Sequence, residues 1–173
     1  MMINSKLIRD IPDFPKPGII FKDVTPILSD ANSFKLIAQK FAELAVNSDY
    51  IVGIEARGFI FASAAANESK KGFIPLRKAG KLPGPVAKQI YELEYGSAEI
   101  EIHSDIYLRG SSVLIVDDVL ATGGTAVAAI KLCEQVGLKV CGLAFLLEIP
   151  ELGGRSQITK HFPMLQINIL LAE

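Results

Sequence analysis

An apolar run that ends in two acids and a pair of glycines is the part of the sequence best suited to chemistry. It occupies Val113 to Thr125 and reads V-L-I-V-D-D-V-L-A-T-G-G-T. The glycines let consecutive backbone N–H groups close around an anion, and a following helix adds the partial positive charge of its N-terminus. We therefore expect a phosphate monoester to bind at Ala121, Thr122, Gly123, Gly124 and Thr125.

The two acids, Asp117 and Asp118, place a second requirement on the ligand. A carboxylate repels phosphate, so these side chains should bind another part of the same molecule, and sugar hydroxyls or Mg²⁺ suit carboxylate oxygen. The pattern predicts a ribose 5-phosphate site. A Walker loop does not fit, because no lysine follows Gly124, and the dinucleotide pattern G-x-G-x-x-G is absent. An acidic turn that only caps a helix remains the alternative.

The rest of the sequence supplies a scaffold that would bring such strand ends together. Short apolar runs alternate with helical patterns, which is typical of an α/β fold with a mostly parallel, twisted sheet flanked by helices. In these sheets ligands bind beyond the carboxyl ends of the strands, where the acids and glycines stand. The expected strands span 50–54, 72–76, 112–116, 138–147 and 165–171, and the expected helices span 30–47, 57–70 and 125–136.

Two segments do not follow this alternation. Residues 10–26 hold four prolines and several apolar side chains, which predicts an irregular loop held against the body of the protein, over a pocket or as a plug of the core edge. Residues 77–85 are rich in glycine, proline and basic side chains and predict a mobile loop. Alternating stretches at 89–95 and 98–103, on either side of Gly96-Ser97, predict a hairpin.

Composition limits the kinds of partner. The formal net charge of −1, from 18 basic and 19 acidic residues, argues against a general nucleic-acid binder but leaves room for a local basic pocket. No apolar run is long enough for a membrane span, and a cytoplasmic protein is expected. Cys133 and Cys141 lie in apolar segments and are expected as free thiols, while His103 and His161 are too isolated for a metal site.

The strand, acid pair and T-G-G-T loop resemble the signature of the type I phosphoribosyltransferases. Four more motifs, in the same order, are similar to the adenine-specific members of that family. They are F-P-x-P-G-I-x-F-x-D-x-T-P at 14–26, E-A-R-G-F at 55–59, R-K-x-G-K-L-P at 77–83 and L-E-Y-G at 93–96. The resemblance covers about residues 5 to 170. It implies a single domain over 1–173, with a helix and a base-binding hood in about 1–28 and a mobile catalytic loop and antiparallel hairpin in about 77–103.

The resemblance also implies a reaction of purine salvage. Adenine and 5-phosphoribosyl 1-pyrophosphate (PRPP) would give AMP and pyrophosphate, with Mg²⁺ held through PRPP and water near Asp117 and Asp118 rather than directly by side chains. The family is usually dimeric, so a homodimer is expected, with no nucleic-acid or membrane partner.

Three residues are implied as catalytic: Arg57, which would meet the pyrophosphate, Lys81 in the basic loop, and Glu94, which would transfer a proton near the imidazole edge of the base. Lys78, beside Lys81, is implied as a PRPP ligand. The family's non-proline cis peptide would fall at Ala56-Arg57. The adenine-binding residues that the resemblance implies are Ile20 and Lys22 through their backbone, Phe21 and Val119 on the two faces of the ring, and Tyr95.

Two alternatives share the PRPP site. A phosphoribosyltransferase for another purine is one, but the 6-oxopurine members usually carry a later Asp in E-D-x-x-D-T-G, and Ala121 stands in that place here. Uracil-specific members carry a proline after the first acid, where this chain has Asp118. A non-catalytic PRPP-sensing regulator is the other alternative, and it would carry an added N-terminal DNA-binding domain, whereas only about 10 residues precede the base-binding loop here.

Overall fold

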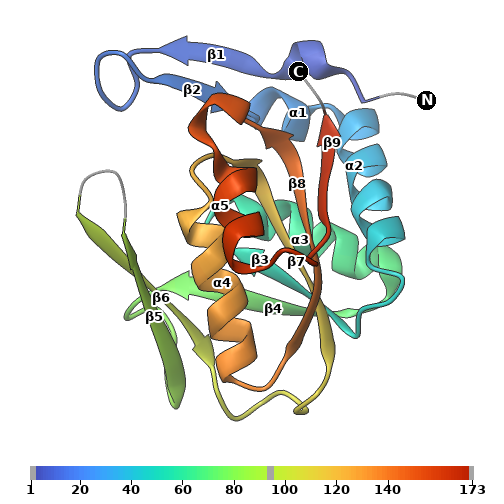
Figure 1. Ribbon diagram of the computed structural model, residues 1–173. Helices are drawn as coiled ribbons and strands as arrows, with labels where there is room; N and C mark the ends of the chain where they lie inside the picture. Colours follow the sequence, from blue (N-terminus) through green and yellow to red (C-terminus); the bar gives the residue numbers. More distant parts are fainter. Residues whose placement is uncertain (1–2, 93–95, 172–173) are drawn as a thin grey trace.

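The computed structural model, which describes residues 3–92 and 96–171, is built on one large sheet with helices on both faces (Figure 1). The seven strands follow the order β5-β6-β4-β3-β7-β8-β9. Five of them form the parallel part, and β5 and β6 form an antiparallel hairpin that pairs with the end of β4. The strands are β3 Tyr50–Ile54, β4 Gly72–Lys78, β5 Val86–Glu92, β6 Ser97–His103, β7 Ser112–Leu120, β8 Lys139–Glu148 and β9 Ile167–Leu171.

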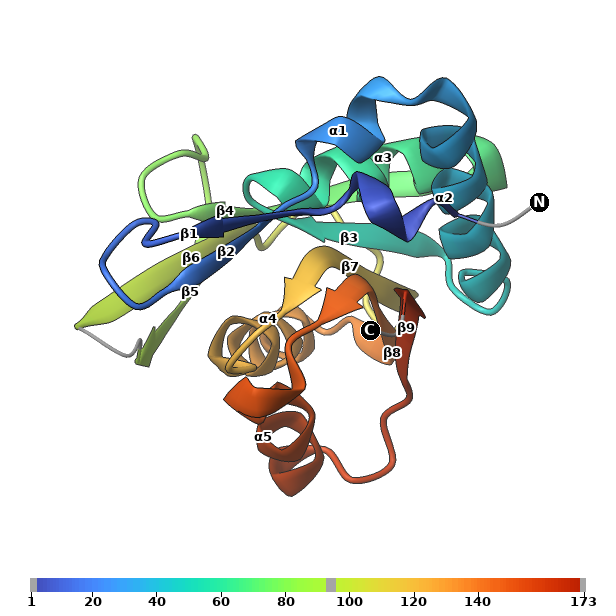
Figure 2. The ribbon, with the colours of Figure 1, turned by 90° about the horizontal axis from the view of Figure 1, so that it is seen from above.

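The helices divide between the two faces of this sheet, as Figure 2 shows. α2 (Ala31–Leu44) and α3 (Arg57–Ser69) cover one face, and α4 (Gly124–Gln135) and α5 (Gly154–His161) cover the other. Alternate residues of β7 serve the two cores: Leu114 and Val116 pack towards α2 and α3, while Val113 and Ile115 pack towards α4. A strand buried on both sides has to be apolar throughout, and the α/β prediction rested on that pattern.

Most predicted elements are confirmed within a few residues. β3 has the predicted bounds, and α2 begins after Asp30, whose carboxylate caps the helix by accepting a hydrogen bond from the Ser33 amide at 2.7 Å. The prediction that β7 ends before the acids was wrong. β7 continues to Leu120, because its ladder with β8 extends through Asp117–Phe145 and Val119–Leu147.

The N-terminal segment is more regular than predicted. β1 (Arg9–Pro12) and β2 (Ile20–Asp23) form an antiparallel two-stranded sheet, so the prediction of an irregular loop over 10–26 was wrong. The prolines are accommodated because Pro12 ends β1, Pro15 and Pro17 lie in the connection, and Pro26 falls in the first turn of α1 (Thr25–Ser29). Figure 1 shows this two-stranded sheet across the end of the large sheet at which β8 and β9 terminate.

The remaining short elements complete the chain. A 3₁₀ turn, η1 (Ser5–Leu7), precedes β1, and a second one, η2 (Pro150–Leu152), joins β8 to α5. α5 was not predicted, because Ile158 is its one buried large side chain and a glycine pair stands at its start. No helix in the described part of the chain has the length and hydropathy needed to cross a membrane.

Candidate active site

A cavity of about 340 Å³ lies between the hood and the carboxyl end of the sheet. β2 supplies one wall, the start of α3 another, and the end of β7 the floor. It brings together residues from Ile19 to Leu152, which are 133 positions apart in the sequence, as predicted for ligand binding at strand ends. The predicted site residues that line it are Ile20, Phe21, Lys22, Arg57, Asp117, Asp118, Val119 and Ala121.

Arg57 is the residue that connects these walls. Its Nε lies 2.6 Å from Asp118 Oδ2, and its Nη1 donates a hydrogen bond to the Lys22 carbonyl at 3.1 Å. Its guanidinium carbon lies 4.6 Å from the centre of the Phe21 ring, a cation–π distance. The first residue of α3 therefore ties the hood to the acid pair on β7.

The acid pair combines negative charge with incomplete pairing. Asp118 is 5% exposed, and apart from the ion pair with Arg57 its Oδ2 accepts no hydrogen bond from the described residues. Burial, and next the charge of Asp118, raise the pKa of Asp117 well above its usual value. Hydroxyl donors or a divalent cation would supply the missing partner of Asp118 and reduce the repulsion between the two acids. The acid pair is therefore suited to the sugar hydroxyls or Mg²⁺ predicted from the sequence.

The Gly-Gly loop forms a small hollow of about 70 Å³ beside the acids, where β7 passes into α4. Gly123 has φ +83°, which a residue with a side chain rarely adopts, and α4 begins at Gly124, one residue earlier than predicted. A Cβ on Gly123 would lie only 2.6 Å from the Gly154 carbonyl oxygen. The predicted loop residues Ala121, Thr122, Gly123 and Thr125 line this hollow, which lies at the N-terminus of a 12-residue helix and so is suited to a phosphate.

The basic loop follows β4, and none of its residues lines the cavity of about 340 Å³. Lys78 and Lys81 are exposed, and Arg77 is held by Glu55, whose carboxylate lies 3.2 Å from Arg77 Nε. The cis peptide that was expected at Ala56-Arg57 is found at Glu55-Ala56 instead; Arg57 is already the first residue of α3, and the cis bond lies ahead of the helix. Glu94 and Tyr95 lie outside the described residues, so no geometry bears on their predicted roles.

Some residues of the site were missed from the sequence. Ile149 and Leu152 line the cavity of about 340 Å³, and Gly154 lies against the Gly-Gly loop. All three follow β8, the parallel neighbour of β7, so the rule that ligands bind beyond strand ends could have indicated this segment. The pair Gly153-Gly154 was the available signal.

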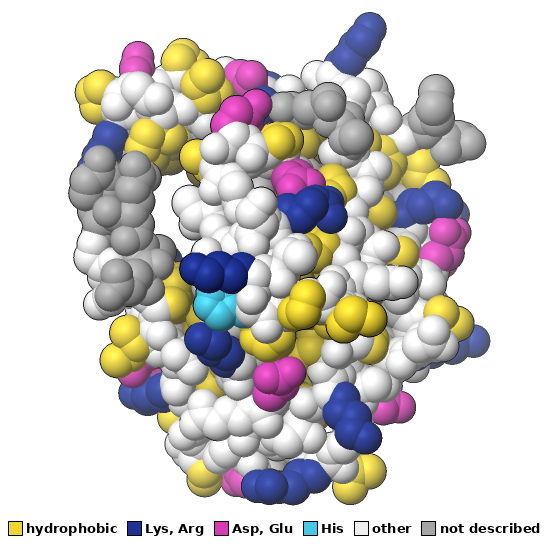
Figure 3. Space-filling model, viewed as in Figure 1, with side chains coloured by type: hydrophobic (Ala, Val, Ile, Leu, Met, Phe, Trp, Pro, Cys, Tyr) yellow, Lys and Arg dark blue, Asp and Glu magenta, His cyan; other side chains and the backbone are white. Residues whose placement is uncertain are grey.

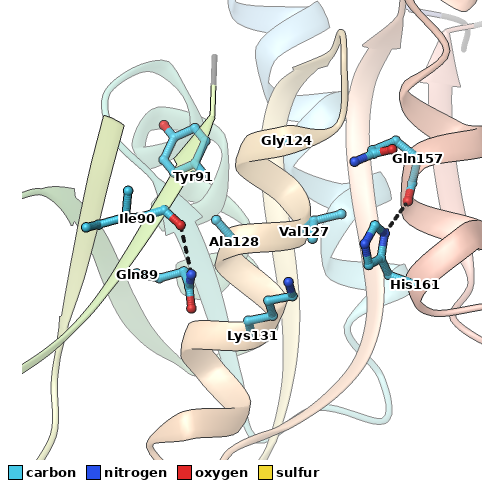
Figure 4. A pocket seen from close by; sticks show the side chains of 9 residues that line it. All are labelled: Gln89, Ile90, Tyr91, Gly124, Val127, Ala128, Lys131, Gln157 and His161. Carbon is cyan, nitrogen blue, oxygen red and sulfur yellow. Dashed lines mark hydrogen bonds between the residues drawn. The ribbon is translucent and has the colours of Figure 1, made fainter. Parts of the chain in front are cut away.

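A second hollow, of about 210 Å³, lies between β5, α4 and α5 (Figure 4). The side chains of Lys131, Gln157 and His161 border it opposite Tyr91, and His161 Nδ1 lies 3.0 Å from the Gln157 carbonyl. Figure 3 shows basic side chains around a histidine on this face of the molecule. Of its lining, only Gly124 belongs to the predicted site. Within the described ranges, no group of three or more His, Cys, Asp or Glu side chains could hold a metal ion.

Comparison with known proteins agrees with this geometry. A family model described as a phosphoribosyl transferase domain matches residues 27–164. A Streptomyces clavuligerus adenine phosphoribosyltransferase is 47% identical over 166 residues, which are 95% of this chain and 93% of that protein. The crystal structure of adenine phosphoribosyltransferase from Thermoanaerobacter pseudethanolicus is 45% identical, with a TM-score of 0.88 and coverage of 96% of this chain and 95% of that one.

A further solved structure contains bound ligands. Adenine phosphoribosyltransferase from Saccharomyces cerevisiae, complexed with an imino-altritol bisphosphate and adenine, is 42% identical. Its TM-score is 0.88, and the match covers 96% of each chain.

Proposed function

This chain belongs to the adenine phosphoribosyltransferases, and from that membership we propose that it transfers the 5-phosphoribosyl group of PRPP to adenine in purine salvage, with AMP and pyrophosphate as products. The observation that carries the proposal is the shared cavity. Phe21 and the backbone of β2 lie across it from Val119, and the acid pair and Gly-Gly loop adjoin it. Base, ribose and phosphate would thus each meet suitable chemistry in the order in which AMP joins them.

The reaction is a substitution at the anomeric carbon. The imidazole nitrogen of adenine forms a bond to that carbon, the bond to the pyrophosphate oxygen breaks, and the proton of the nitrogen passes to Glu94. Asp117 and Asp118 would bind the ribose hydroxyls, and the loop from Ala121 to Thr125 would bind the 5-phosphate by its backbone. Preorganised charge of this kind stabilises a transition state without further rearrangement.

The leaving group, pyrophosphate, carries a large negative charge, so we expect cationic side chains to bind it. We assign that role to Lys81, with Lys78, and to Arg57. Arg57 pairs with Asp118 and lies against Phe21, so PRPP would compete with Asp118 for its guanidinium. Closing the basic loop and hairpin over the site would also exclude water, which competes with adenine for the same carbon.

Mg²⁺ is the proposed cofactor. Asp118 Oδ2, which accepts no hydrogen bond from the described residues, and the partly buried Asp117 carboxylate offer the oxygen ligands that this ion prefers, either through water or through the ribose hydroxyls. When bound with PRPP, the ion would neutralise charge on the pyrophosphate.

Base specificity is assigned to the hood. Adenine presents an amino donor beside a ring acceptor, and the backbone of Ile20 and Lys22 can offer the complementary pair while Phe21 and Val119 hold the ring. A 6-oxopurine reverses that pattern and would leave buried groups unpaired, at a cost of about 1 to 3 kcal/mol each. Tyr95 is assigned to the same end of the site.

The wider setting is proposed from the family and from two observations. The hood of about residues 1–28 and the catalytic loop of about 77–103 are taken as parts of one domain, since the hood lines the base cavity together with β7. A homodimer is proposed because the family is usually dimeric. A cytoplasmic location is proposed, and the free thiols Cys133 and Cys141 agree with a reducing compartment.

The experiment that tests the proposal is product formation from PRPP and Mg²⁺ with adenine, hypoxanthine, guanine or uracil in parallel. AMP from adenine alone, abolished by chelation of the metal and restored by Mg²⁺, is the expected result. Turnover of a 6-oxopurine would contradict the assignment of the hood while leaving the PRPP site in place. Tight PRPP binding without turnover of any base would contradict catalysis and favour a sensor of PRPP.

A further inference from the structure

A buried carboxylate lies beneath the basic loop, and nothing in the reaction accounts for it. Glu101, on β6, is 1% exposed. Its Oε1 accepts hydrogen bonds from the backbone N–H groups of Lys81, at 2.7 Å, and Leu82, at 2.8 Å. Burial alone would raise the pKa of Glu101, but the N–H groups of Gly80, Leu82 and Lys81 together hold that pKa below its usual value. These hydrogen bonds favour the ionised form of the Glu101 carboxyl group.

The backbone around Glu101 has the form of an anion-binding nest. Gly80 has φ +81°, and the N–H groups that follow it converge on one oxygen. The anion in this nest is the protein's own carboxylate. Contacts from this loop to an external phosphate must then come from side chains, and Lys81 is the exposed cation at its centre.

The other end of the loop is fixed by a second carboxylate. Glu55 accepts a hydrogen bond from the Lys78 amide at 2.9 Å and lies 3.2 Å from Arg77 Nε. Arg77 Nη1 in turn donates to the Lys81 carbonyl at 3.2 Å. Glu101 accepts hydrogen bonds from the amides of Lys81 and Leu82. The backbone on both sides of the Lys81 Cα is therefore anchored to buried or partly buried acids.

We propose that Glu101 is a positioning residue for phosphoribosyl transfer, whose carboxylate fixes the loop backbone from Gly80 to Leu82 so that Lys81 is presented to the pyrophosphate. Glu101 touches no substrate, and its effect passes through Lys81. This inference rests on the proposed function, because it assigns Glu101 a part in that reaction.

Glu99 provides a matched control. It lies two residues earlier on the same strand, and its carboxylate lies 3.6 Å from Lys88 Nζ, whereas the Glu101 carboxylate lies 3.9 Å from that atom. The side chain of Glu99 makes no hydrogen bond to the described loop amides; its carbonyl accepts from Ala79, and that contact survives any substitution. Glu99→Ala thus removes a neighbouring charge of the same strand and leaves the nest intact.

The test compares Glu101→Ala, Glu101→Gln and Glu99→Ala by steady-state kinetics and by hydrogen exchange of the Lys81 and Leu82 amides. In Glu101→Ala we expect kcat to fall at least 10-fold, KM for adenine to stay within 2-fold, and both amides to exchange at least 10-fold faster. Glu101→Gln keeps an acceptor oxygen and should recover at least 3-fold of the lost kcat. Glu99→Ala should stay within 2-fold of the unmodified protein in kcat and in exchange.

Equal behaviour of Glu101→Ala and Glu99→Ala in kcat and exchange would overturn the proposal, as would unprotected Lys81 and Leu82 amides in the unmodified protein. If Glu101→Ala does not fold, Glu101→Gln against Glu99→Gln makes the same comparison, with at least 3-fold faster exchange expected in the former. An unmodified protein without adenine phosphoribosylation would defeat the proposed function, and the exchange comparison would still decide whether Glu101 orders the loop.

Discussion

Arg57 Nε lies 2.6 Å from Asp118 Oδ2, although the two residues belong to different elements and are 61 positions apart. The ion pair joins the start of α3 to the end of β7, and the same guanidinium lies against Phe21 of the hood. A single side chain therefore contacts groups assigned to the base and to the ribose.

Asp118→Asn should separate catalysis from stability. The substitution removes the ion pair with Arg57 and the acceptor proposed for the ribose, and we expect kcat/KM for PRPP to fall about 100-fold. It also removes the repulsion between Asp118 and Asp117, which offsets the loss of the ion pair. The unfolding temperature should therefore fall by no more than about 2 °C. Enzyme kinetics and thermal melts measure the two effects.

Glu148→Gln is the control for Asp118→Asn. Glu148 pairs with Arg155 at 2.8 Å at the same end of the sheet, on the neighbouring strand. Its loss should leave kcat/KM within 2-fold. A similar fall in both variants would mean that any carboxylate at this sheet end supports activity, against a specific role for Asp118.

Phe21→Ala should weaken adenine binding selectively. Stacking of a base on an aromatic ring contributes about 1 to 3 kcal/mol, so KM for adenine should rise about 10- to 100-fold while KM for PRPP changes less than 3-fold. Phe14→Ala is the matched control, because the Phe14 ring packs edge-to-face with the Phe21 ring at 5.1 Å between ring centres and is 52% exposed. Steady-state kinetics with each substrate varied in turn measures both KM values. An equal rise in KM for adenine in the two variants would contradict stacking on Phe21.

The fold class could be predicted from the sequence, because a strand that is buried on both faces of a sheet has to be apolar throughout. β3 and β7 are recognisable on that ground, and the acids and glycines after such a strand indicate the site. The extension of β7 through Asp117 and Asp118 was not visible, because two adjacent acids usually mark the end of a buried strand, and the β8 strand that continues beside them comes from a distant segment. The residue at which β7 ends is set by its pairing with β8, and this pairing cannot be inferred from the sequence of β7 alone.

The hood and the supports of the site were the least accessible to sequence reasoning. Four prolines suggested an irregular loop, yet β1 and β2 pair because the prolines fall at the end of β1, in the connection and in the first turn of α1. Glu101 reads as an ordinary hairpin charge, and only the folded loop reveals the amides that surround it. Anchoring roles of this kind depend on three-dimensional contacts between residues about 20 positions apart.

Asp23 should give the hood a stability that depends on pH. Hydrogen bonds from Thr25 and then from Arg9 lower the pKa of Asp23 from 3.8 to about 2. A lowered pKa stabilises the folded state above the unfolded pKa, and this contribution is lost as the pH falls through the folded value. We expect Asp23→Asn to cost about 1 to 2 kcal/mol at pH 7, roughly half of that at pH 3, and little at pH 2.

Urea unfolding of the unmodified protein and Asp23→Asn at each pH measures this difference. Glu43→Gln removes an exposed pair with Lys40, at 2.8 Å on α2, and should change the free energy of unfolding by less than about 0.5 kcal/mol at every pH. A cost of Asp23→Asn that stayed constant from pH 7 to pH 2 would show that the carboxylate charge is not its source.

Gly154→Ala and Gly153→Ala should distinguish support of the Gly-Gly loop from backbone strain. A Cβ on Gly154 would lie 2.9 Å from Leu120 Cδ1 and would press on the Ala121 carbonyl, so the loop proposed to bind the 5-phosphate has to move. KM for PRPP should rise at least 10-fold. Gly153 has φ +68° and open space around its Cβ position, so Gly153→Ala should cost about 1 kcal/mol of stability and leave KM within 2-fold. Because the two glycines are adjacent and only one touches the loop, equal changes in KM would place the effect in α5 as a whole and remove Gly154 from the support of the phosphate site.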